Sequence, residues 1–256
     1  SARVSVIECA IPIRQGSQIV DSDLRNRFRR RARGRASGAS LPTLQPSAEA
    51  VSVASDALAR GGLVIVPTDT VYGIAADARD DAAVLAVYAA KRRSADFPLQ
   101  LLFGRDPSWL ERHAVVTPAA RTLVDALGPG GWTIIVPARE GWASPALSGG
   151  ATVGFRMVPV EITLDVIDAL GGPVAASSAN ISGGTSPLTC AEAVAQVGAA
   201  CAAAIDNGPT PQGIGSTVID ASGADVRILR EGAIDRATVA RILGLAQIPV
   251  ARSIRS

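Results

Sequence analysis

The chain has 256 residues, a net charge of +2, 48% apolar residues and 4% aromatic residues. This length fits one large domain or two small ones, and the apolar fraction is sufficient to bury a core. The sequence contains no run of 18 or more apolar residues, so we expect no transmembrane helix. The three cysteines have no CxxC spacing, and His113 is the only histidine. The composition therefore argues against a disulfide framework, a zinc site or a Ser-His-Asp triad, and it favours a reducing cytoplasmic location.

Positive charge is concentrated before residue 46. Residues 1–45 contain nine arginines against Glu8, Asp21 and Asp23, a net charge of +6, whereas the rest of the chain sums to −4. The run "RNRFRRRARGRASGAS" has no sustained helical period and passes into glycine and serine. We predict that residues 1–45 form a poorly ordered basic extension, because such a composition buries no core. The alternatives are an arm that contacts nucleic-acid phosphates, and a transit peptide, which the three acidic residues disfavour.

From residue 46 strands and helices alternate, which predicts an α/β domain over 46–246 and a short tail over 247–256. Helices are predicted where a capping residue precedes an apolar period, and strands where short apolar runs occur. In chain order these elements are a helix from Ser47 to Gly61, a strand at 63–67, a helix from Asp80 or Asp81, a strand at 99–103, a helix from Thr117 to Leu127, strands at 132–137 and 152–157, a helix over 160–170, a strand at 173–177, a helix after Thr189, strands at 202–206, 216–220 and 226–229, and a helix from Asp235 to Gly244. The pairs 132–137 with 152–157 and 216–220 with 226–229 read as hairpin-like neighbours. We therefore expect a mixed twisted sheet with helices on its faces.

Four polar segments lie at the ends of predicted elements, where open α/β sheets bind ligands. They are "PTDTVYG" at 67–73, "KRRSADFPL" at 91–99, "SSANISGGTSP" at 177–187 and "GIGSTVID" at 213–220, the last followed by Arg230. Taken singly, each has an ordinary explanation as a turn or as cations at a helix C-terminus. Together they offer hydroxyls, an amide, glycines and cations, which suit phosphate. No GxxxxGK[ST] occurs and "GPGG" at 128–131 is not GxGxxG, so a nucleotide would bind without a Walker loop.

Six pieces of the sequence, in this order, resemble the YrdC/Sua5 family of threonylcarbamoyl-AMP synthases. They are "PTDTVYGIAA", "KRR…PL", "TVGFRM", "AASSANISGGTSP", "GSTVID" and "ILREGAI", and they span roughly residues 47–244. Each piece is weak alone, and the series is specific. The resemblance implies a YrdC-like twisted mixed α/β sheet flanked by helices, with a concave substrate groove, in the short single-domain form. It also implies the reaction: L-threonine, bicarbonate and ATP give threonylcarbamoyl-adenylate and pyrophosphate for the t6A modification of tRNA.

The same resemblance implies roles for particular residues. Lys91 and Arg93 match the family's lysine-x-arginine motif and are expected to act in catalysis and to bind ATP. The residues expected to bind threonine and bicarbonate are Thr68, Thr70, Arg156 and Ser216. The further residues expected to bind ATP are Thr152, Ser178, Asn180, Ser186 and Arg230. Mg2+ is expected to be held by the ATP phosphates and by no protein side chain.

Lys91 is the only lysine in a chain with 24 arginines. A compact ammonium can reach a carbamate and phosphate oxygens together, whereas the flat fork of an arginine cannot fill the same space. We therefore predict that Lys91→Arg loses activity. The alternative is that one lysine survives here by chance.

Four residues depart from the family pattern. Ser94 stands where proline is usual, Phe97 where asparagine is common, Leu102 where a polar residue is frequent, and Ala176 where threonine is frequent. These departures leave two alternatives open, an altered substrate or a weakened activity. One alternative function is a carbamoyl-transfer enzyme with another amine substrate, and another is a noncatalytic RNA-binding module. As an adenylate synthase, the protein is expected to work with the t6A transferase machinery, with tRNA indirectly, and away from membranes.

Overall fold

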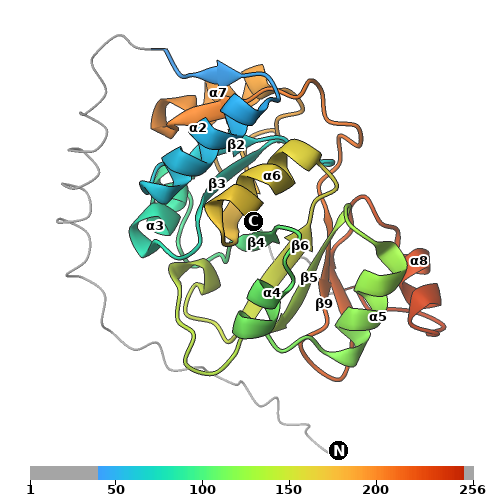
Figure 1. The fold of residues 1–256 in the computed structure, drawn as a ribbon. Coiled ribbons are helices and arrows are strands. Elements are labelled where there is room, and N and C mark those ends of the chain that lie inside the picture. Colours follow the sequence, from blue (N-terminus) through green and yellow to red (C-terminus); the bar gives the residue numbers. More distant parts are fainter. Residues whose placement is uncertain (1–39, 251–256) are drawn as a thin grey trace, which may run out of the picture. The chain divides into compact units, whose positions relative to one another are not determined.

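The computed structural model describes residues 40–250, which form a ten-stranded sheet with helices on its faces (Figure 1). Residues 1–39 and 251–256 lie outside the described residues, and with them most of the predicted extension and the end of the predicted tail. The strand order is β1-β8-β2-β3-β7-β4-β6-β5-β9-β10. The predicted fold class, a mixed α/β sheet flanked by helices, is confirmed.

The elements have the following bounds. The strands are β1 (Thr43–Leu44), β2 (Val64–Val66), β3 (Gly73–Asp77), β4 (Gln100–Phe103), β5 (Trp132–Pro137), β6 (Thr152–Met157), β7 (Val174–Ser178), β8 (Ala203–Ile205), β9 (Thr217–Asp220) and β10 (Arg227–Arg230). The helices are α2 (Ala48–Ala59), α3 (Asp81–Lys91), α4 (Ser108–His113), α5 (Pro118–Leu127), α6 (Glu161–Leu170), α7 (Cys190–Val197) and α8 (Arg236–Ile242), with short 3-10 helices at Pro145–Leu147 and Gly198–Ala200.

The sheet mixes parallel and antiparallel pairs. Strand β8 pairs in parallel with β1 and β2, as does β4 with β6 and β5 with β9. The two predicted hairpin-like pairs are confirmed, because β5 pairs antiparallel with β6 and β9 with β10. The remaining pairs, β2 with β3, β3 with β7 and β7 with β4, are also antiparallel.

Strand β3 lies in the middle of the sheet, and the sequence did not predict it. Its residues "GIAAD" are all buried and pair on both sides, with β2 and with β7. Glycine and alanine have a low strand propensity, so the segment reads as a continuation of the polar turn before it. Strand position is decided here by pairing and burial, not by side-chain type. Helix α4 and the two-residue β1 are likewise absent from the prediction.

The folded domain extends beyond both of its predicted boundaries, residues 46 and 246. Strand β1 lies before residue 46 and pairs with β8. At the other end Ile248 is buried, and the backbone N–H of Ile228 donates to the carbonyl oxygen of Pro249 at 3.0 Å. The described parts of the predicted extension and tail therefore contribute to the sheet and the core.

The predicted helix starts are made by the residues that the sequence indicated. Ser47 Oγ accepts from the N–H of Ala50 at 3.1 Å, and Asp235 accepts from Thr238 at 2.7 Å. Thr189 and Glu192 form a complete capping box at the start of α7. Such caps satisfy N–H groups that the first helical turn leaves without partners.

Helices α2 and α6 lie side by side and cover one face of the sheet (Figure 1). Their apolar side chains form one core cluster with residues of β8, β2, β3, β7 and β4. Leu102 of β4 and Ala176 of β7 belong to this cluster. Among the strands, the cluster ends at β4, and farther along the sheet the same face carries Arg156 of β6 and Thr133 of β5.

Within residues 40–250, every helix is too short or too polar to pass through a lipid bilayer. Cys190 and Cys201 are buried, as expected of small apolar side chains. Cys9 lies outside the described residues.

Candidate active site

The sheet register brings polar residues from several strands to one face. Gln100 of β4 lies opposite Gly154 of β6, and Leu102 opposite Arg156. Residues opposite each other in neighbouring strands point to the same face, and alternate residues share a face. Because Gly154 also lies opposite Ile135 of β5, Thr133 shares the face of Arg156. This face is the one that α2 and α6 cover on the other half of the sheet.

Lys91 is the last residue of α3 and is only 2% exposed. Its Nζ donates to the carbonyl oxygen of Asn180 at 2.7 Å and to that of Ser178, at the end of β7. Two of its three N–H donors are therefore used, and they tie α3 to the "SSAN" segment. Burial, and to a smaller extent the charge of Arg93, lowers the pKa of Lys91 to about 8.

The backbone after Lys91 turns sharply. Arg92 has a left-handed conformation with φ 51°, and the N–H of Arg93 donates to the carbonyl oxygen of Tyr88 at 2.9 Å. This is the helix C-terminus usually made with glycine, and it sets Arg93 beside Lys91. Burial lowers the pKa of the Arg93 guanidinium, whose Nε is buried without a partner. Phe97, one of the departures from the family pattern, lies under this guanidinium at 5.5 Å from its ring centre.

Arg156 of β6 is buried and forms an ion pair with Asp69 in the β2–β3 turn. Its Nη1 also donates to Thr70 Oγ1 at 2.8 Å, while its Nε is buried without a partner. Burial lowers the pKa of the Arg156 guanidinium, and the charge of Asp69 opposes this shift. Asp69 further accepts from the N–H of Gly131 at 2.8 Å and from Gln212 Nε2 at 3.3 Å. One carboxylate thus joins three loops around the arginine.

Thr68 shapes the same turn, as predicted from the sequence. Its hydroxyl donates to the carbonyl oxygen of Val71 at 2.6 Å and lies 3.1 Å from the hydroxyl of Thr70. Such local bonds from threonine to the backbone fix tight turns. Thr70 therefore stands between Thr68 and Arg156 in one hydrogen-bonded series.

Ser216, which leads into β9, meets Arg230 of β10 on the side of β6 that lies away from β7. Arg230 is exposed along part of its length, and its guanidinium donates to the Ser216 carbonyl oxygen at 2.9 Å and to Ser216 Oγ at 3.2 Å. Ser216 Oγ also lies 2.8 Å from Thr133 Oγ1, which donates to Gln100 Oε1 at 2.6 Å. Burial and the nearby charge of Arg93 lower the pKa of Arg230.

The cations act on one another. The charge of Arg93 lowers the pKa of Lys91 and of Arg230, and the charge of Arg230 lowers the pKa of Arg156. Like charges shift each other in this way only when they are close. Lys91 at the end of α3 and Arg93 just after this helix therefore form one cluster with Arg156 of β6 and Arg230 of β10. Among the described residues, Asp69 is the only carboxylate paired with this cluster.

The four remaining predicted ATP-binding residues are Thr152, Ser178, Asn180 and Ser186, and their side chains form no hydrogen bond with the four cations. Asn180 is buried, and its Nδ2 donates to the carbonyl oxygens of Ile181 at 2.8 Å and Gly184 at 2.9 Å, which leaves Oδ1 without a partner. Ser178 is half-buried at the end of β7. Thr152 is exposed at the start of β6, and Ser186 is half-buried. Neither of these last two contacts the cluster through its side chain in the described part of the chain.

The sequence analysis assigned no role to three residues of the site: Asp69, Gln100 and Thr133. Asp69 stood within the quoted "PTDTVYG" as its one acidic residue, which was a usable signal. Gln100 and Thr133 are single polar residues inside the apolar strands "LQLLF" and "WTIIVP". A polar residue in a buried strand needs a hydrogen-bond partner, and here each provides the other's.

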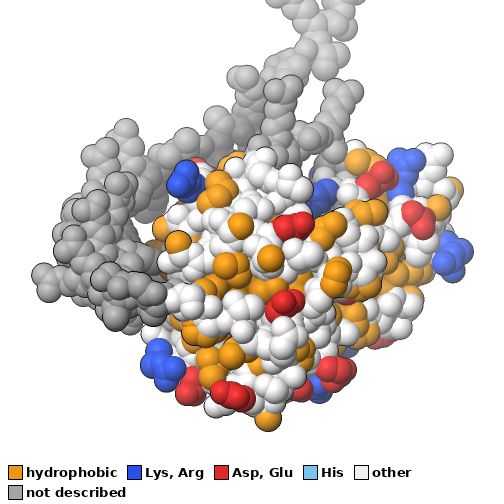
Figure 2. All heavy atoms as spheres, turned by 90° about the horizontal axis from the view of Figure 1, so that it is seen from above, with side chains coloured by type: hydrophobic (Ala, Val, Ile, Leu, Met, Phe, Trp, Pro, Cys, Tyr) orange, Lys and Arg blue, Asp and Glu red, His pale blue; other side chains and the backbone are white. Residues whose placement is uncertain are grey.

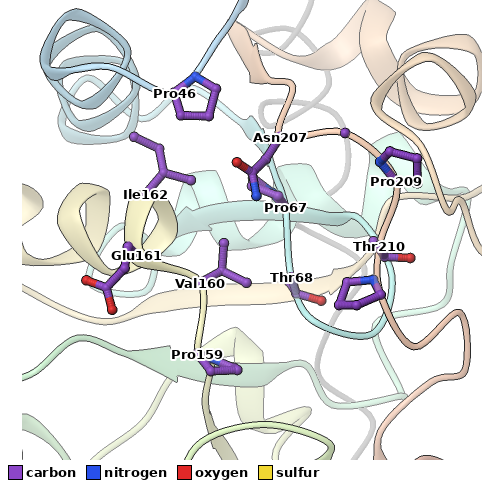
Figure 3. Close-up of a pocket in the computed structure, with 12 residues that line it drawn as sticks. Pro46, Pro67, Thr68, Pro159, Val160, Glu161, Ile162, Asn207, Pro209 and Thr210 are labelled. Atoms are coloured by element: carbon purple, nitrogen blue, oxygen red, sulfur yellow. The ribbon is translucent and has the colours of Figure 1, made fainter.

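A cavity of about 380 Å³ borders the site (Figure 3). Its walls include Pro67, Pro159 and Ile162, and Thr68 is its only member from the predicted site residues. It contains Glu161 and no lysine or arginine. The cation cluster therefore lies outside this cavity. The face drawn in Figure 2 carries scattered charged side chains of both signs among hydrophobic and uncharged atoms, and its described part shows no broad basic patch.

The fold and the site define an α/β protein with a partly buried cation cluster suited to a polyanionic ligand. The chain belongs to the Sua5/YciO/YrdC family, whose model, described as "Telomere recombination", matches residues 56–232. A Mycobacterium tuberculosis protein provisionally named threonylcarbamoyl-AMP synthase is 38% identical over 192 residues, which cover 74% of this chain and 87% of the relative. Bacillus subtilis threonylcarbamoyl-AMP synthase is 34% identical over 196 residues, 76% of this chain and 56% of the relative. The crystal structure of Pyrococcus abyssi Sua5 complexed with L-threonine is 30% identical, with a TM-score of 0.78 over 85% of this chain and 66% of that chain.

Proposed function

We propose that this protein is a threonylcarbamoyl-AMP synthase, which makes threonylcarbamoyl-adenylate and pyrophosphate from L-threonine, bicarbonate and ATP. The observation that carries the proposal is the convergence of Lys91, Arg93, Arg156 and Arg230 in a chain of this family. The product would supply the t6A modification of tRNA through a separate transferase, and the location would be cytoplasmic.

Threonine binding is assigned to Arg156 and the turn beside it. A guanidinium binds a carboxylate through parallel N–H donors, and the buried Nε of Arg156 has no partner within the protein. Thr70 is hydrogen-bonded to the same arginine, and Thr68 holds Thr70 in place. Ser216 would contact the substrate from the opposite side.

ATP binding is assigned to the remaining cations and the loop after β7. Lys91, Arg93 and Arg230 would neutralise the phosphates, which lowers the cost of bringing an anionic carbamate to an anionic phosphate. Ser178 and Asn180 lie next to Lys91, and Asn180 Oδ1 offers a buried acceptor. Thr152 and Ser186 would complete the nucleotide contacts at the edge of the site.

The reaction needs no protein nucleophile. The threonine amine adds to bicarbonate with loss of water and gives a carbamate. A carbamate oxygen then forms a bond to the α-phosphorus of ATP, and the bond to pyrophosphate breaks. The protein would contribute the positions of the two reactants and the neutralisation of charge.

The described residues include no group of three or more His, Cys, Asp or Glu side chains that could hold a metal ion. The donor set of the site, which is cationic, suits Mg2+ only as an ion carried by the ATP phosphates. When bound, Mg2+ would screen the charge of those phosphates. Lys91, Arg93 and Arg230 would share that task from the protein side.

An alternative is carbamoyl transfer to another amine. The sequence departs from the family pattern at Leu102 and Ala176, which share the sheet face of Arg156 and belong to the adjoining core cluster, and a changed pocket there would favour this alternative. The synthase and this alternative are distinguished by an assay of pyrophosphate release. The purified protein is supplied with ATP, Mg2+, bicarbonate and each amino acid in turn. Release that depends on L-threonine supports the synthase, release with a different amine supports the alternative, and no release with any amino acid refutes both.

Lys91→Arg tests the role of the ammonium in the same assay. We expect it to lower the rate at least about tenfold, because the fork of arginine cannot reproduce the point charge and its bonds to two carbonyl oxygens. A matched control is Arg112→Lys on the exposed α4, which changes the same two residue types away from the site. Full activity of Lys91→Arg would contradict the assigned role.

A further inference from the structure

Gln100 at the start of β4 has no role in the proposed reaction, yet its side chain reaches across the sheet. Its Oε1 accepts from Thr133 Oγ1 of β5 at 2.6 Å, although β6 lies between β4 and β5. The bridge passes over Gly154 of β6. A Cβ at that position would lie 3.3 Å from Thr133 Cγ2 and 4.0 Å from Gln100 Cβ. The missing side chain of Gly154 therefore leaves the space in which Gln100 and Thr133 meet.

The bridge continues to Ser216 and Arg230, and the chemistry of its ends fixes the direction of each hydrogen bond. The amide oxygen of Gln100 can only accept, and the guanidinium of Arg230 can only donate. Thr133 gives its single hydroxyl proton to Gln100. Ser216 Oγ, 2.8 Å away, must then donate to Thr133 Oγ1. Arg230 Nη2 donates to Ser216 Oγ at 3.2 Å.

Ser216 is left without a free proton. Its hydroxyl proton is used by Thr133, one lone pair is used by Arg230, and one lone pair remains. Toward a ligand, Ser216 can therefore act only as an acceptor. A ligand group in contact with it must be a hydrogen-bond donor. Because Ser216 and Thr133 are 3% and 4% exposed, water does not readily replace these bonds.

We propose that Gln100 is a positioning and specificity-determining residue, which acts through Thr133 and Ser216 to select an amino acid whose side chain donates a hydrogen bond. This inference rests on the proposed function. If the substrate carboxylate lies on Arg156 of β6 and its amine points toward Lys91, which ends α3 beside β7, the substrate side chain would turn to the opposite side. Ser216, which leads into β9, lies on that side. The hydroxyl of threonine is a donor of the required kind.

The experiment compares binding of L-threonine and O-methyl-L-threonine to the full chain by titration calorimetry. The methyl ether keeps the oxygen as an acceptor and removes the proton. We expect the natural protein to bind threonine more tightly than its methyl ether. In Gln100→Met the acceptor is lost, Thr133 can donate to Ser216, and Ser216 can then donate to the ether. We expect the preference to shrink about three- to tenfold, the value of one neutral hydrogen bond.

Gln100→Glu is the matched variant, because a carboxylate is also an acceptor and keeps the direction of the bonds. Gln100→Glu should retain the preference for L-threonine over its methyl ether, whether or not the added charge changes ATP binding. Thr133→Val should shrink the preference as Gln100→Met does, and it provides the result if Gln100→Met does not fold. An unchanged preference in the Met and Val variants, an equal loss in Gln100→Glu, or no binding of either amino acid by the natural protein overturns the proposal. Threonine binding that depends on Gln100 without pyrophosphate release refutes the proposed function and leaves this inference standing.

Discussion

Asp69 and Arg156 form an ion pair in which the two side chains are only 4% and 3% exposed. The pair lies where the β2–β3 turn, the Gly131 turn and the loop holding Gln212 meet. A buried charge that loses its partner is costly, because neither water nor another side chain compensates it. This pair therefore supports both the local fold and the orientation of Arg156.

We expect Asp69→Asn to lower the free energy of unfolding by about 3–5 kcal/mol, the usual cost of leaving a buried charge without its partner. Urea unfolding measures this change. The control is Asp56→Asn in α2. Its partner is Arg60, the C-cap residue of this helix, and the side chains of Asp56 and Arg60 are 62% and 72% exposed. That change should cost about 0.5 kcal/mol or less. Equal effects in the two variants would contradict the structural role of Asp69.

ATP affinity should depend on pH through Lys91. Its pKa is lowered to about 8, so the ammonium is present below that pH and is lost as the pH rises through it. We expect ATP affinity, measured by titration calorimetry, to fall about tenfold between pH 7 and pH 9. Lys91→Met should bind ATP more weakly and show a flatter profile. A slope that is the same in both proteins would mean that another group titrates.

The same pKa has a consequence for stability. The folded-state pKa of Lys91 lies below its ordinary value of 10.5, so the unfolded chain binds more protons between about pH 8 and pH 10. The contribution of Lys91 to stability therefore rises with pH in this window. Urea unfolding of the natural protein and of Lys91→Met should diverge in favour of the natural protein as the pH increases. A divergence of the opposite sign would show that burial does not depress this pKa.

Arg92 ends α3 with a positive φ of 51° that glycine adopts at lower cost. We expect Arg92→Gly to raise the free energy of unfolding by about 0.5–1 kcal/mol. Arg92→Ala keeps the Cβ and should bring no gain. Because Arg92 is exposed, the gain should come without loss of pyrophosphate release. Destabilisation by glycine at this position would show that the left-handed turn is not strained.

Gly232 packs against the backbone that carries Ser216. A Cβ on Gly232 would lie 2.1 Å from the carbonyl oxygen of Gly215 and 2.5 Å from the carbonyl carbon of Ser216. Gly232→Ala must displace this backbone, and we expect the KM for threonine to rise about tenfold or more. Gly223→Ala is the control, since no atom lies within 4 Å of a Cβ there. An unchanged KM for threonine in Gly232→Ala would contradict a role for Ser216 in threonine binding.

Much of the fold followed from local sequence signals. The capping residues of α2, α7 and α8 predicted helix starts, and short apolar runs predicted eight of the ten strands, all except β1 and β3. Strand β3 was invisible because small residues carry no strand signal until two neighbours enclose them. The order of strands, with β4 and β7 between β3 and β6, depends on pairings between segments far apart in sequence.

The residues of the site likewise fall into two groups, those that sequence motifs indicate and those that only the folded structure reveals. Lys91, Arg93, Arg156, Ser216 and Arg230 could be named from motifs, and the structure brings them together. The bridge from Gln100 to Thr133 could not be named, because it depends on the register of three strands and on a glycine between two side chains. No motif records such a relationship.

The most direct measurement supplies the purified protein with ATP, Mg2+, L-threonine and 13C-labelled bicarbonate and identifies the product by mass spectrometry. The proposed function predicts threonylcarbamoyl-adenylate that carries one 13C atom, together with pyrophosphate, and far less of both from Lys91→Arg. Absence of the labelled adenylate from the natural protein, with ATP left intact, would contradict it.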